Sequence, residues 1–378
     1  MRKRSSRRSI VTICAAGIMA VGAVCPAMAE SLADYSEKLH VMYEIDEVKS
    51  VDEASSYQVE WIQVEKEKAE QALLHSEVVS EKPDATGIRI ETKSDEMEEL
   101  LYLYDGGKAS GVTGCMFGGI RYWCLTRDGE ASPSYDKQVN VYMDHPETME
   151  QLARYDSRID FSQEAELEFA DRTETVNDIE KLLEDISGVE LEVSKVYSLD
   201  QETMREHAER LHKQNAIWGE MEERVTEKEA YLIQLRQVVD GILLANHNWA
   251  MQGFSVTEMQ AEAIVSEDGL EETEMKGAVT VQQEIAKGKL ISPQEAEAIY
   301  LEELKKTILV SDLYVENLEL NYVVVQNGKQ LEMVPAWIFC IARKVKTEPV
   351  EPNGEDMIWD YSHMVINAET GEQILNME

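Results

Sequence analysis

Cysteine is scarce in this chain, with 5 residues among 378. Three of them, Cys115, Cys124 and Cys340, lie beyond the first 29 residues. So few cysteines exclude a small disulfide-stabilised scaffold. Cys115 and Cys124 flank a Gly-Gly pair, so a hairpin there would bring them within reach of a disulfide; the alternative is two separately buried thiols. Cys340 is left over and is expected to be a small core residue rather than a nucleophile.

Basic side chains are also few. Lys and Arg number 36 against 74 Asp and Glu, which gives a formal net charge of −38. Nucleic-acid binding needs a basic surface that replaces the counterions of phosphate, so this composition excludes it. The same excess of acid argues against electrostatic docking on anionic lipid. Solubility explains an acidic surface, and weak cation binding is a second explanation that it allows.

Motifs of catalysis and metal binding are absent. The chain has no H-E-x-x-H, no G-x-S-x-G and no EF-hand loop. His207 and His212 lie five residues apart, off the i, i+4 spacing at which two helical histidines converge on a metal. The glycine-rich stretch 105–114 lacks the Gly-Lys-Ser/Thr ending of a phosphate-binding loop and precedes a strand pattern, which favours turns between strands. We assign no catalytic residue, cofactor or metal ligand, and the sequence favours a protein that is not an enzyme.

Long hydrophobic runs are missing outside the N-terminus. Five basic residues between Arg2 and Arg8 precede the uncharged apolar segment 10–25, and Ala27-Met28-Ala29 fits a signal-peptidase site. The apolar segment is shorter than the ~20 residues of a membrane-spanning helix. We therefore predict a signal peptide over residues 1–29, cleavage after Ala29, and a protein that is secreted or associated with the cell envelope.

The N-terminus also has features of two other export signals. Lipid anchoring at Cys25 is disfavoured because Val24 occupies the position where lipobox signals carry Gly or Ala. The Ser6–Val11 segment is similar to a twin-arginine signal, so export by either route stays open.

Periodicity divides the rest of the chain into three blocks. We predict a strand-rich N-terminal domain over 30–155, a middle α+β domain over 156–288 and a C-terminal α+β module over 289–378. The expected fold class is α+β, with helices packed on antiparallel meander sheets in two helix-on-sheet modules, plus the N-terminal block.

Local signals predict the elements of the first two blocks. Strands are predicted at 57–64, 87–91, 100–104, 119–125, 137–143, 164–170 and 189–199, and helices at 66–76, from about 173 to Gly188, and at 202–222. Asp240-Gly241 places a turn within 230–245, and 259–275 is predicted to be a hairpin about Glu267-Asp268-Gly269.

The C-terminal module has the clearest signals. Ser292 and Glu295 form a capping box with Pro293 at the first helical position, which predicts a helix to about residue 306. Strands are predicted up to an Asn327-Gly328 turn, at 334–342 and at 357–366. Pro335 has no amide hydrogen, so its strand is predicted to be an edge or to begin after it.

This capped helix and meander, with Val334-Pro335-Ala336-Trp337 and Ile366-Asn367-Ala368-x-Thr370-Gly371, resembles the PepSY-like modules of Gram-positive envelope proteins and the YycH/YycI type of extracytoplasmic regulators. The resemblance implies an inhibitory, sensory or envelope-associated binding module, with no shared catalytic residues. A cleavable signal in place of a membrane anchor departs from the regulator type and argues against direct control of a membrane kinase.

The expected function is an exported, non-enzymatic binding or regulatory module for an extracytoplasmic partner, with no membrane-spanning segment after signal cleavage. The alternative is a secreted hydrolase with a dispersed acidic active site, because carboxylates abound. The candidate binding surface lies on the C-terminal sheet around Tyr322, Trp337 and Trp359, although both tryptophans are also typical of a sheet core.

Overall fold

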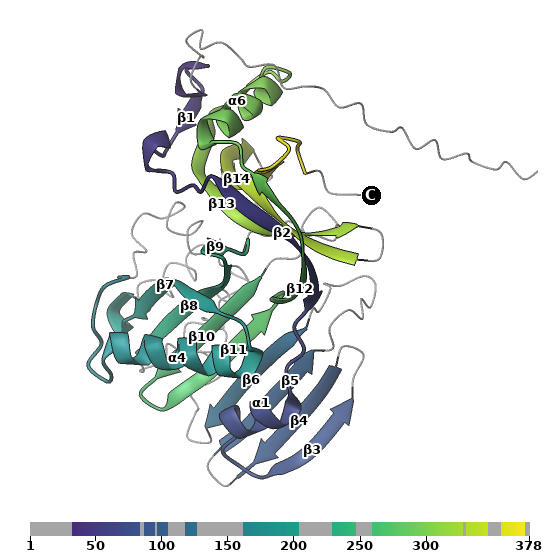
Figure 1. Cartoon of the computed structure of the whole chain (residues 1–378). Coiled ribbons are helices and arrows are strands. Elements are labelled where there is room, and N and C mark those ends of the chain that lie inside the picture. Colours follow the sequence, from purple (N-terminus) through teal and green to yellow (C-terminus); the bar gives the residue numbers. More distant parts are fainter. Residues whose placement is uncertain are drawn as a thin grey trace, which may run out of the picture.

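A computed structural model describes residues 32–83, 87–94, 97–104, 118–126, 162–203, 229–246, 259–327, 330–346 and 357–374. These residues form two β-sheets, one above the other in Figure 1, with helices on their faces. The structure is strand-rich, its sheets are almost entirely antiparallel, and its described helices are few. The α+β prediction therefore holds in outline, with sheet as the dominant element.

The large sheet has nine strands in the order β3-β4-β5-β6-β11-β10-β8-β7, with β9 paired to β8. Its strands are β3 (Val78–Pro83), β4 (Gly87–Lys93), β5 (Met97–Tyr104), β6 (Gly119–Thr126), β7 (Leu191–Leu199), β8 (Ala230–Val239), β9 (Ile242–Leu243), β10 (Gln260–Ser266) and β11 (Gly269–Lys276). Two helices, α1 (Lys66–Leu73) and α4 (Arg172–Ser187), contact each other and cover one face of this sheet (Figure 1).

The small sheet has six strands in the order β1-β13-β14-β2-β12, with β15 also paired to β14. Its strands are β1 (Leu39–Val41), β2 (Glu53–Trp61), β12 (Val279–Lys289), β13 (Leu313–Asn327), β14 (Gln330–Lys346) and β15 (Met357–Asn367), and two 3-10 turns, η1 (Leu32–Asp34) and η2 (Ile45–Glu47), flank β1. The helix α6 (Pro293–Leu304) packs on this sheet through Tyr300, whose ring stacks on Phe339 of β14 at a centroid distance of 4.7 Å.

The strands β2 and β12 connect the two sheets. They pair along their length within the small sheet, and Ile62 N donates to Ala278 O at 3.1 Å where they reach the large sheet. Every strand of the large sheet lies between β2 and β12 in the sequence. The large sheet is therefore an insertion into the small one.

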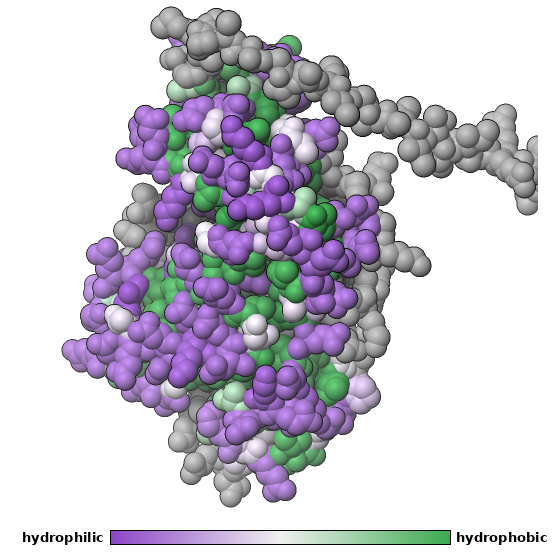
Figure 2. All heavy atoms as spheres, in the orientation of Figure 1, coloured by the Kyte–Doolittle hydropathy of each residue, from purple (hydrophilic) through white to green (hydrophobic). Residues whose placement is uncertain are grey.

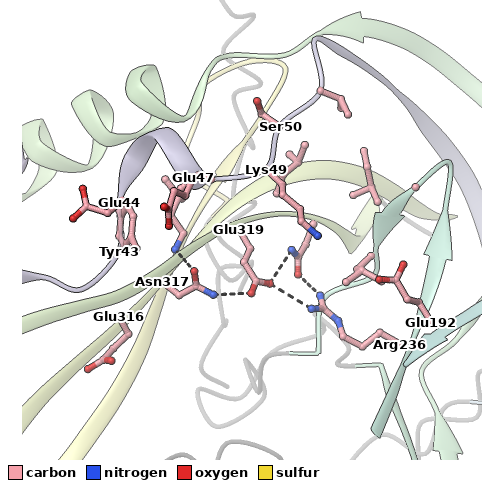
Figure 3. A pocket seen from close by; sticks show the side chains of 18 of the residues that line it. Tyr43, Glu44, Glu47, Lys49, Ser50, Glu192, Arg236, Glu316, Asn317 and Glu319 are labelled. Atoms are coloured by element: carbon pink, nitrogen blue, oxygen red, sulfur yellow. Dashed lines mark hydrogen bonds and ion pairs between the residues drawn. The ribbon is translucent and has the colours of Figure 1, made fainter. Parts of the chain in front are cut away.

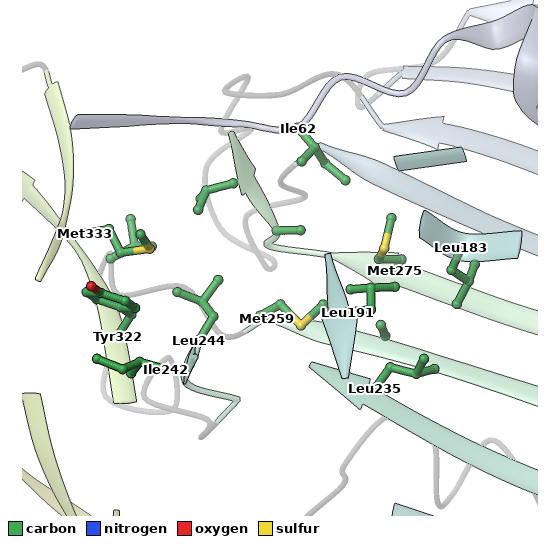
Figure 4. Close-up of a cluster of buried hydrophobic side chains, with 14 of the residues drawn as sticks. Ile62, Leu183, Leu191, Leu235, Ile242, Leu244, Met259, Met275, Tyr322 and Met333 are labelled. Carbon is green, nitrogen blue, oxygen red and sulfur yellow. The ribbon is translucent and has the colours of Figure 1, made fainter. Parts of the chain in front are cut away.

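One hydrophobic cluster runs through both sheets (Figure 4). At the junction, Tyr322 and Met333 of the small sheet face Ile242 and Leu244, and the cluster continues through Met259 into the large sheet. Each of these five residues is at most 4% exposed. Since burying one such apolar side chain contributes about 1.5–3 kcal/mol, this junction holds the two sheets together.

The predicted helices are confirmed where the structure describes them. Asp171 caps α4 by accepting a hydrogen bond from Glu174 N at 2.9 Å, and Gly188 ends it at a φ of 72°, where a side chain is disfavoured. Ser292 and Glu295 form the predicted capping box of α6. Of the predicted helix 202–222, the part from residue 204 onward lies outside the described residues, as does the predicted strand 137–143.

The predicted strand at 164–170 is wrong. Side chains, rather than a strand ladder, satisfy the backbone of this segment. Leu167 N donates to the Tyr231 hydroxyl at 2.7 Å, and the Ser198 hydroxyl donates to Ala165 O at 2.6 Å. Conversely, β12 was not predicted, because most of its residues are exposed and no apolar alternation marks it.

The prediction that the strand at Pro335 is an edge or begins after this residue is also wrong, because β14 starts at Gln330 and has neighbours on both sides. One side of β14 pairs first with β2, up to Met333, and then with β15, from Ala336 onward. Pro335 falls in the gap between these two partners, where this edge needs no amide hydrogen.

The predicted domain boundaries do not match the two sheets. The large sheet combines strands from both sides of residue 155, and the small sheet takes β1 and β2 from the N-terminal block. The predicted helix-on-sheet modules are therefore not separate units. Sequence periodicity identifies strands but does not say which distant strand each one pairs with.

Candidate functional site: a cleft between the two sheets

A cavity of about 980 Å³ lies at the junction of the two sheets (Figure 3). The segment 42–51 around η2 forms one wall, the turn between β8 and β9 forms the other, and residues 316–321 of β13 form the base. Its volume is within the range typical of small-molecule sites.

Each wall is fixed by hydrogen bonds to the rest of the fold. Met42 N donates to Val315 O at 2.9 Å, and the Tyr43 hydroxyl donates to Glu297 Oε1 of α6 at 2.9 Å. On the other side, Asp240 and Gly241 adopt φ values of 50° and 75°, which make the tight turn predicted from their sequence. This turn brings Leu244 into a parallel bridge with Tyr322 of β13.

An ion pair between buried Arg236 and partly exposed Glu319 joins the two sheets at the base of the cleft. Arg236 of β8 is 6% exposed, and its Nη1 lies 3.3 Å from Glu319 Oε2 of β13. The guanidinium also donates to Leu244 O from Nε and Nη2, at 3.0 and 2.9 Å, and from Nη2 to Asn321 Oδ1. All three nitrogens of Arg236 are therefore engaged by the protein.

Glu319 is held by further donors. Asn317 Nδ2 donates to its Oε1 at 2.6 Å, and Asn321 Nδ2 donates to its Oε2 at 3.3 Å. Burial opposes ionisation of Glu319, but the charge of Arg236 and these amide hydrogen bonds outweigh it and lower its pKa. Lys195 is also close enough to interact electrostatically with both partners, and burial lowers its pKa. The base of the cleft is thus a preorganised network whose carboxylate stays ionised.

The rim of the cleft is acidic above an apolar lining. Four carboxylates surround it: Glu44, Glu47, Glu192 and Glu316. One cation, Lys49, extends from the 42–51 wall toward the base (Figure 3). The apolar part comes from both walls and from β13, through Met42, Val48, Val51, Ile242, Leu318 and Leu320. With Arg236 and Glu319 included, acidic groups exceed basic ones.

Two of the three residues predicted to form a binding surface, Tyr322, Trp337 and Trp359, are not exposed at all. Tyr322 and Trp337 are both 0% exposed. Their polar atoms are bonded internally, the Tyr322 hydroxyl to Ser55 O at 2.9 Å and Trp337 Nε1 to Ile291 O at 3.0 Å. They are core residues of the small sheet. The side chain of Trp359 lies outside the described residues.

The predicted Cys115–Cys124 disulfide remains a prediction. Cys124 is a half-buried free thiol in the structure, and Cys115 lies outside the described residues. A thiol count on the denatured, unreduced protein distinguishes a bridge from two thiols.

Sequence reasoning missed Arg236 and Glu319, although a signal was present. Arg236 is the charged residue in the otherwise apolar and amide run of β8, and Glu319 alternates with Leu318 and Leu320 on β13. A charge within a buried strand requires a partner. The partner is 83 residues away in sequence, which no local pattern reveals.

A second buried polar cluster surrounds Glu99 of β5, whose side chain is fully buried. Its carboxylate accepts hydrogen bonds from the amides of His75 and Ser76, from His75 Nδ1, and from the hydroxyls of Thr92 and Tyr122. Burial opposes ionisation, but these donors lower the pKa of Glu99. The cluster ties the chain after α1 to the large sheet, and none of its residues lines the cleft, so we assign it a structural role.

Surface features of the described residues add little chemistry. Hydrophilic side chains cover most of the face shown in Figure 2, with hydrophobic groups between them. In the described parts of the chain, no three His, Cys, Asp or Glu residues gather as a metal site would require. None of the helices described is both long and apolar enough to span a membrane.

The fold and the cleft together define a two-sheet, strand-rich α+β protein with a polar site at the junction of its sheets. No family model matches the chain, and no curated protein matches it. Among solved structures, it is similar to an uncharacterized protein from Eubacterium rectale ATCC 33656, whose crystal structure was determined at 1.45 Å resolution. The two are 15% identical, with 90% of this chain and 92% of that chain covered and a TM-score of 0.56. This likeness shows the fold alone, so the resemblance to PepSY-like modules stays a prediction.

Proposed function

We propose that this protein is an exported, non-enzymatic binding or regulatory module of the cell envelope, and that it engages its ligand or partner in the cleft between the two sheets. The observation that carries the proposal is the cleft itself, whose base is a preorganised network around Arg236 and Glu319. Binding sites favour such concave surfaces, with an apolar lining and a few fixed polar groups.

Export is supported by the sequence of the N-terminus. The basic segment, the apolar segment 10–25 and the Ala27-Met28-Ala29 site have the order of a cleaved signal peptide. A strongly acidic chain is suited to remaining soluble outside the cell. N-terminal sequencing of the protein from its native host tests this part, and a mature chain that starts elsewhere than Glu30 contradicts it.

The alternative, a secreted hydrolase with an acidic site, is favoured by one observation, the carboxylates around the cleft. Acid–base hydrolysis needs one carboxyl group held protonated, with its pKa raised. Glu319, at the centre of the cleft, has the opposite perturbation, because Arg236 and two amides stabilise its ionised form. Binding therefore accounts for the cleft better than hydrolysis does.

Site-specific photo-cross-linking tests the binding function. A photo-cross-linking residue replaces Ser50, which lies in the cleft wall and is exposed, and in a matched variant it replaces Ser311, which is exposed and outside the cleft. We expect a partner from envelope extracts to be captured from position 50 and not from position 311. Equal capture at both positions contradicts the proposal, as does no capture at either position together with no binding of a small ligand in the cleft.

A further inference from the structure

The charge of the cleft is the feature that says most about its ligand. Five carboxylates line the cavity against two basic groups, Lys49 and Arg236. The charges of Arg236 and Glu319 largely cancel, because their side chains lie 3.3 Å apart. Lys195 and Glu192 also interact electrostatically with Arg236 and add one charge of each sign to this base. The remaining carboxylates of the lining, Glu44, Glu47 and Glu316, outnumber Lys49, so the net charge of the cleft is negative.

An anionic ligand does not fit this arrangement. The usual anion-binding group would be Arg236, but its Nε, Nη1 and Nη2 already donate to Leu244 O, Glu319 and Asn321. An anion would have to break a buried, charge-assisted network and then face the rim carboxylates. The cleft therefore selects against phosphate or a free carboxylate.

The shape of the lining adds a second requirement. Between the rim charges and the base, both walls and β13 present aliphatic side chains, among them Val48, Ile242 and Leu320. An alkyl stem buries apolar surface there, while its charged ends remain at the rim. A cavity of about 980 Å³ is large enough for such an extended group.

We propose that the cleft binds a ligand that carries two or more primary ammonium groups on an aliphatic stem, either a free polyamine or the lysine side chains of a basic peptide. The ammonium groups pair with carboxylates on opposite walls, Glu47 of η2 and Glu192 of β7, and the methylenes lie on the apolar lining. This inference rests on the proposed binding function and names the chemistry of its ligand.

Isothermal titration calorimetry on the full chain tests the proposal, with spermidine and trilysine as the two sources of ammonium groups. Acetylated trilysine removes the side-chain charges, and inorganic phosphate is the anionic probe. We expect one or both amines to bind, acetylated trilysine to bind at least tenfold more weakly, and phosphate not to bind. Tighter binding of spermidine indicates a free polyamine as the ligand, and tighter binding of trilysine indicates a basic peptide.

A charge-matched pair of variants separates the cleft from the general acidity of the chain. The cleft variant combines Glu47→Gln with Glu192→Gln, and the control combines Glu67→Gln with Glu267→Gln, which are equally exposed and lie outside the cleft. Exposed ion pairs contribute about 0.2–1 kcal/mol each, so removing two predicts a loss of affinity of about two- to thirtyfold in the cleft variant and no change in the control.

The outcomes are distinct. Equal weakening in both variants shows diffuse attraction and overturns the proposal, as does binding of phosphate at the cleft. If no amine binds while cross-linking from position 50 still captures a partner, the ligand class is wrong and the binding function stands. If no amine binds and cross-linking from position 50 captures no partner, both the ligand class and the binding function are refuted.

Discussion

Substitution of Glu99 tests how much a buried, hydrogen-bonded carboxylate contributes to the stability of the fold. Both of its carboxylate oxygens accept from His75 N, Oε1 also from His75 Nδ1 and the Tyr122 hydroxyl, and Oε2 also from Ser76 N and the Thr92 hydroxyl. In Glu99→Gln, one oxygen becomes an NH2 donor. The Thr92 hydroxyl can rotate to accept from it, but a backbone N–H cannot, so either orientation of the amide leaves His75 N or Ser76 N facing another donor.

The magnitude follows from that conflict. An unsatisfied buried donor costs about 1–3 kcal/mol, and hydrogen bonds to a charged group are each worth about 1.5–3 kcal/mol. We expect Glu99→Gln to lower the free energy of unfolding by about 2–4 kcal/mol, measured by urea unfolding near neutral pH. The neighbouring Glu98→Gln is the control, since Glu98 is exposed and forms a surface ion pair with Lys93, so its loss should be about 0.5 kcal/mol or less.

The pH dependence gives an independent readout. The folded pKa of Glu99 lies below its ordinary value of 4.5. A depressed carboxyl pKa stabilises the folded state above the unfolded pKa, and this contribution is lost as the pH falls through the folded pKa. The difference in unfolding free energy between wild type and Glu99→Gln should therefore be constant at neutral pH and shrink below about pH 4.5. A Glu99→Gln loss no larger than that of Glu98→Gln, or a difference independent of pH, would refute the reasoning.

Three further predictions concern packing, capping and the cleft. Gly119→Ala places a Cβ 1.9 Å from the backbone oxygen of Met275, so strand β6 must shift. Thermal unfolding should show a loss of about 1–3 kcal/mol or more in the free energy of unfolding. An unchanged Tm contradicts the pairing of β6 with β11 at this position. Ser292→Ala removes the cap of α6 and should cost about 1 kcal/mol in urea unfolding, whereas Ser292→Asp should keep most of it. Glu319→Gln leaves the buried charge of Arg236 less well compensated and should lower the free energy of unfolding by about 1–3 kcal/mol. A stabilised variant would show that the ion pair does not stabilise the junction of the two sheets.

The sequence was a good guide to structure wherever the cause was local. The capping box at Ser292, the left-handed glycine at Gly188 and the Asp240-Gly241 turn depend on residues within a few positions of one another, and all three are confirmed. The same locality explains the failures. Pro335 lies inside β14 because two distant strands share one of its edges, and no local rule anticipates such a gap.

The candidate site could not be predicted from the sequence, because it too depends on contacts between residues far apart in the chain. Arg236 and Glu319 belong to different sheets and meet through the insertion of one sheet into the other. Aromatic residues such as Tyr322 and Trp337 are common in binding surfaces, but large aromatic side chains also fill cores. Burial distinguishes the two roles, and both residues are buried.

The insertion of the large sheet between β2 and β12 also sets an order in time for synthesis of the chain from its N-terminus. The described strands of the large sheet are all available once residue 276 has emerged, whereas the small sheet waits for β15, which ends at Asn367. During that interval β1 and β2 have been synthesised without their partners β13 and β14, and their edges are open to other chains. Because the C-terminal strands are made last, β1 and β2 appear before every other strand but are the last to have their edges covered by partner strands.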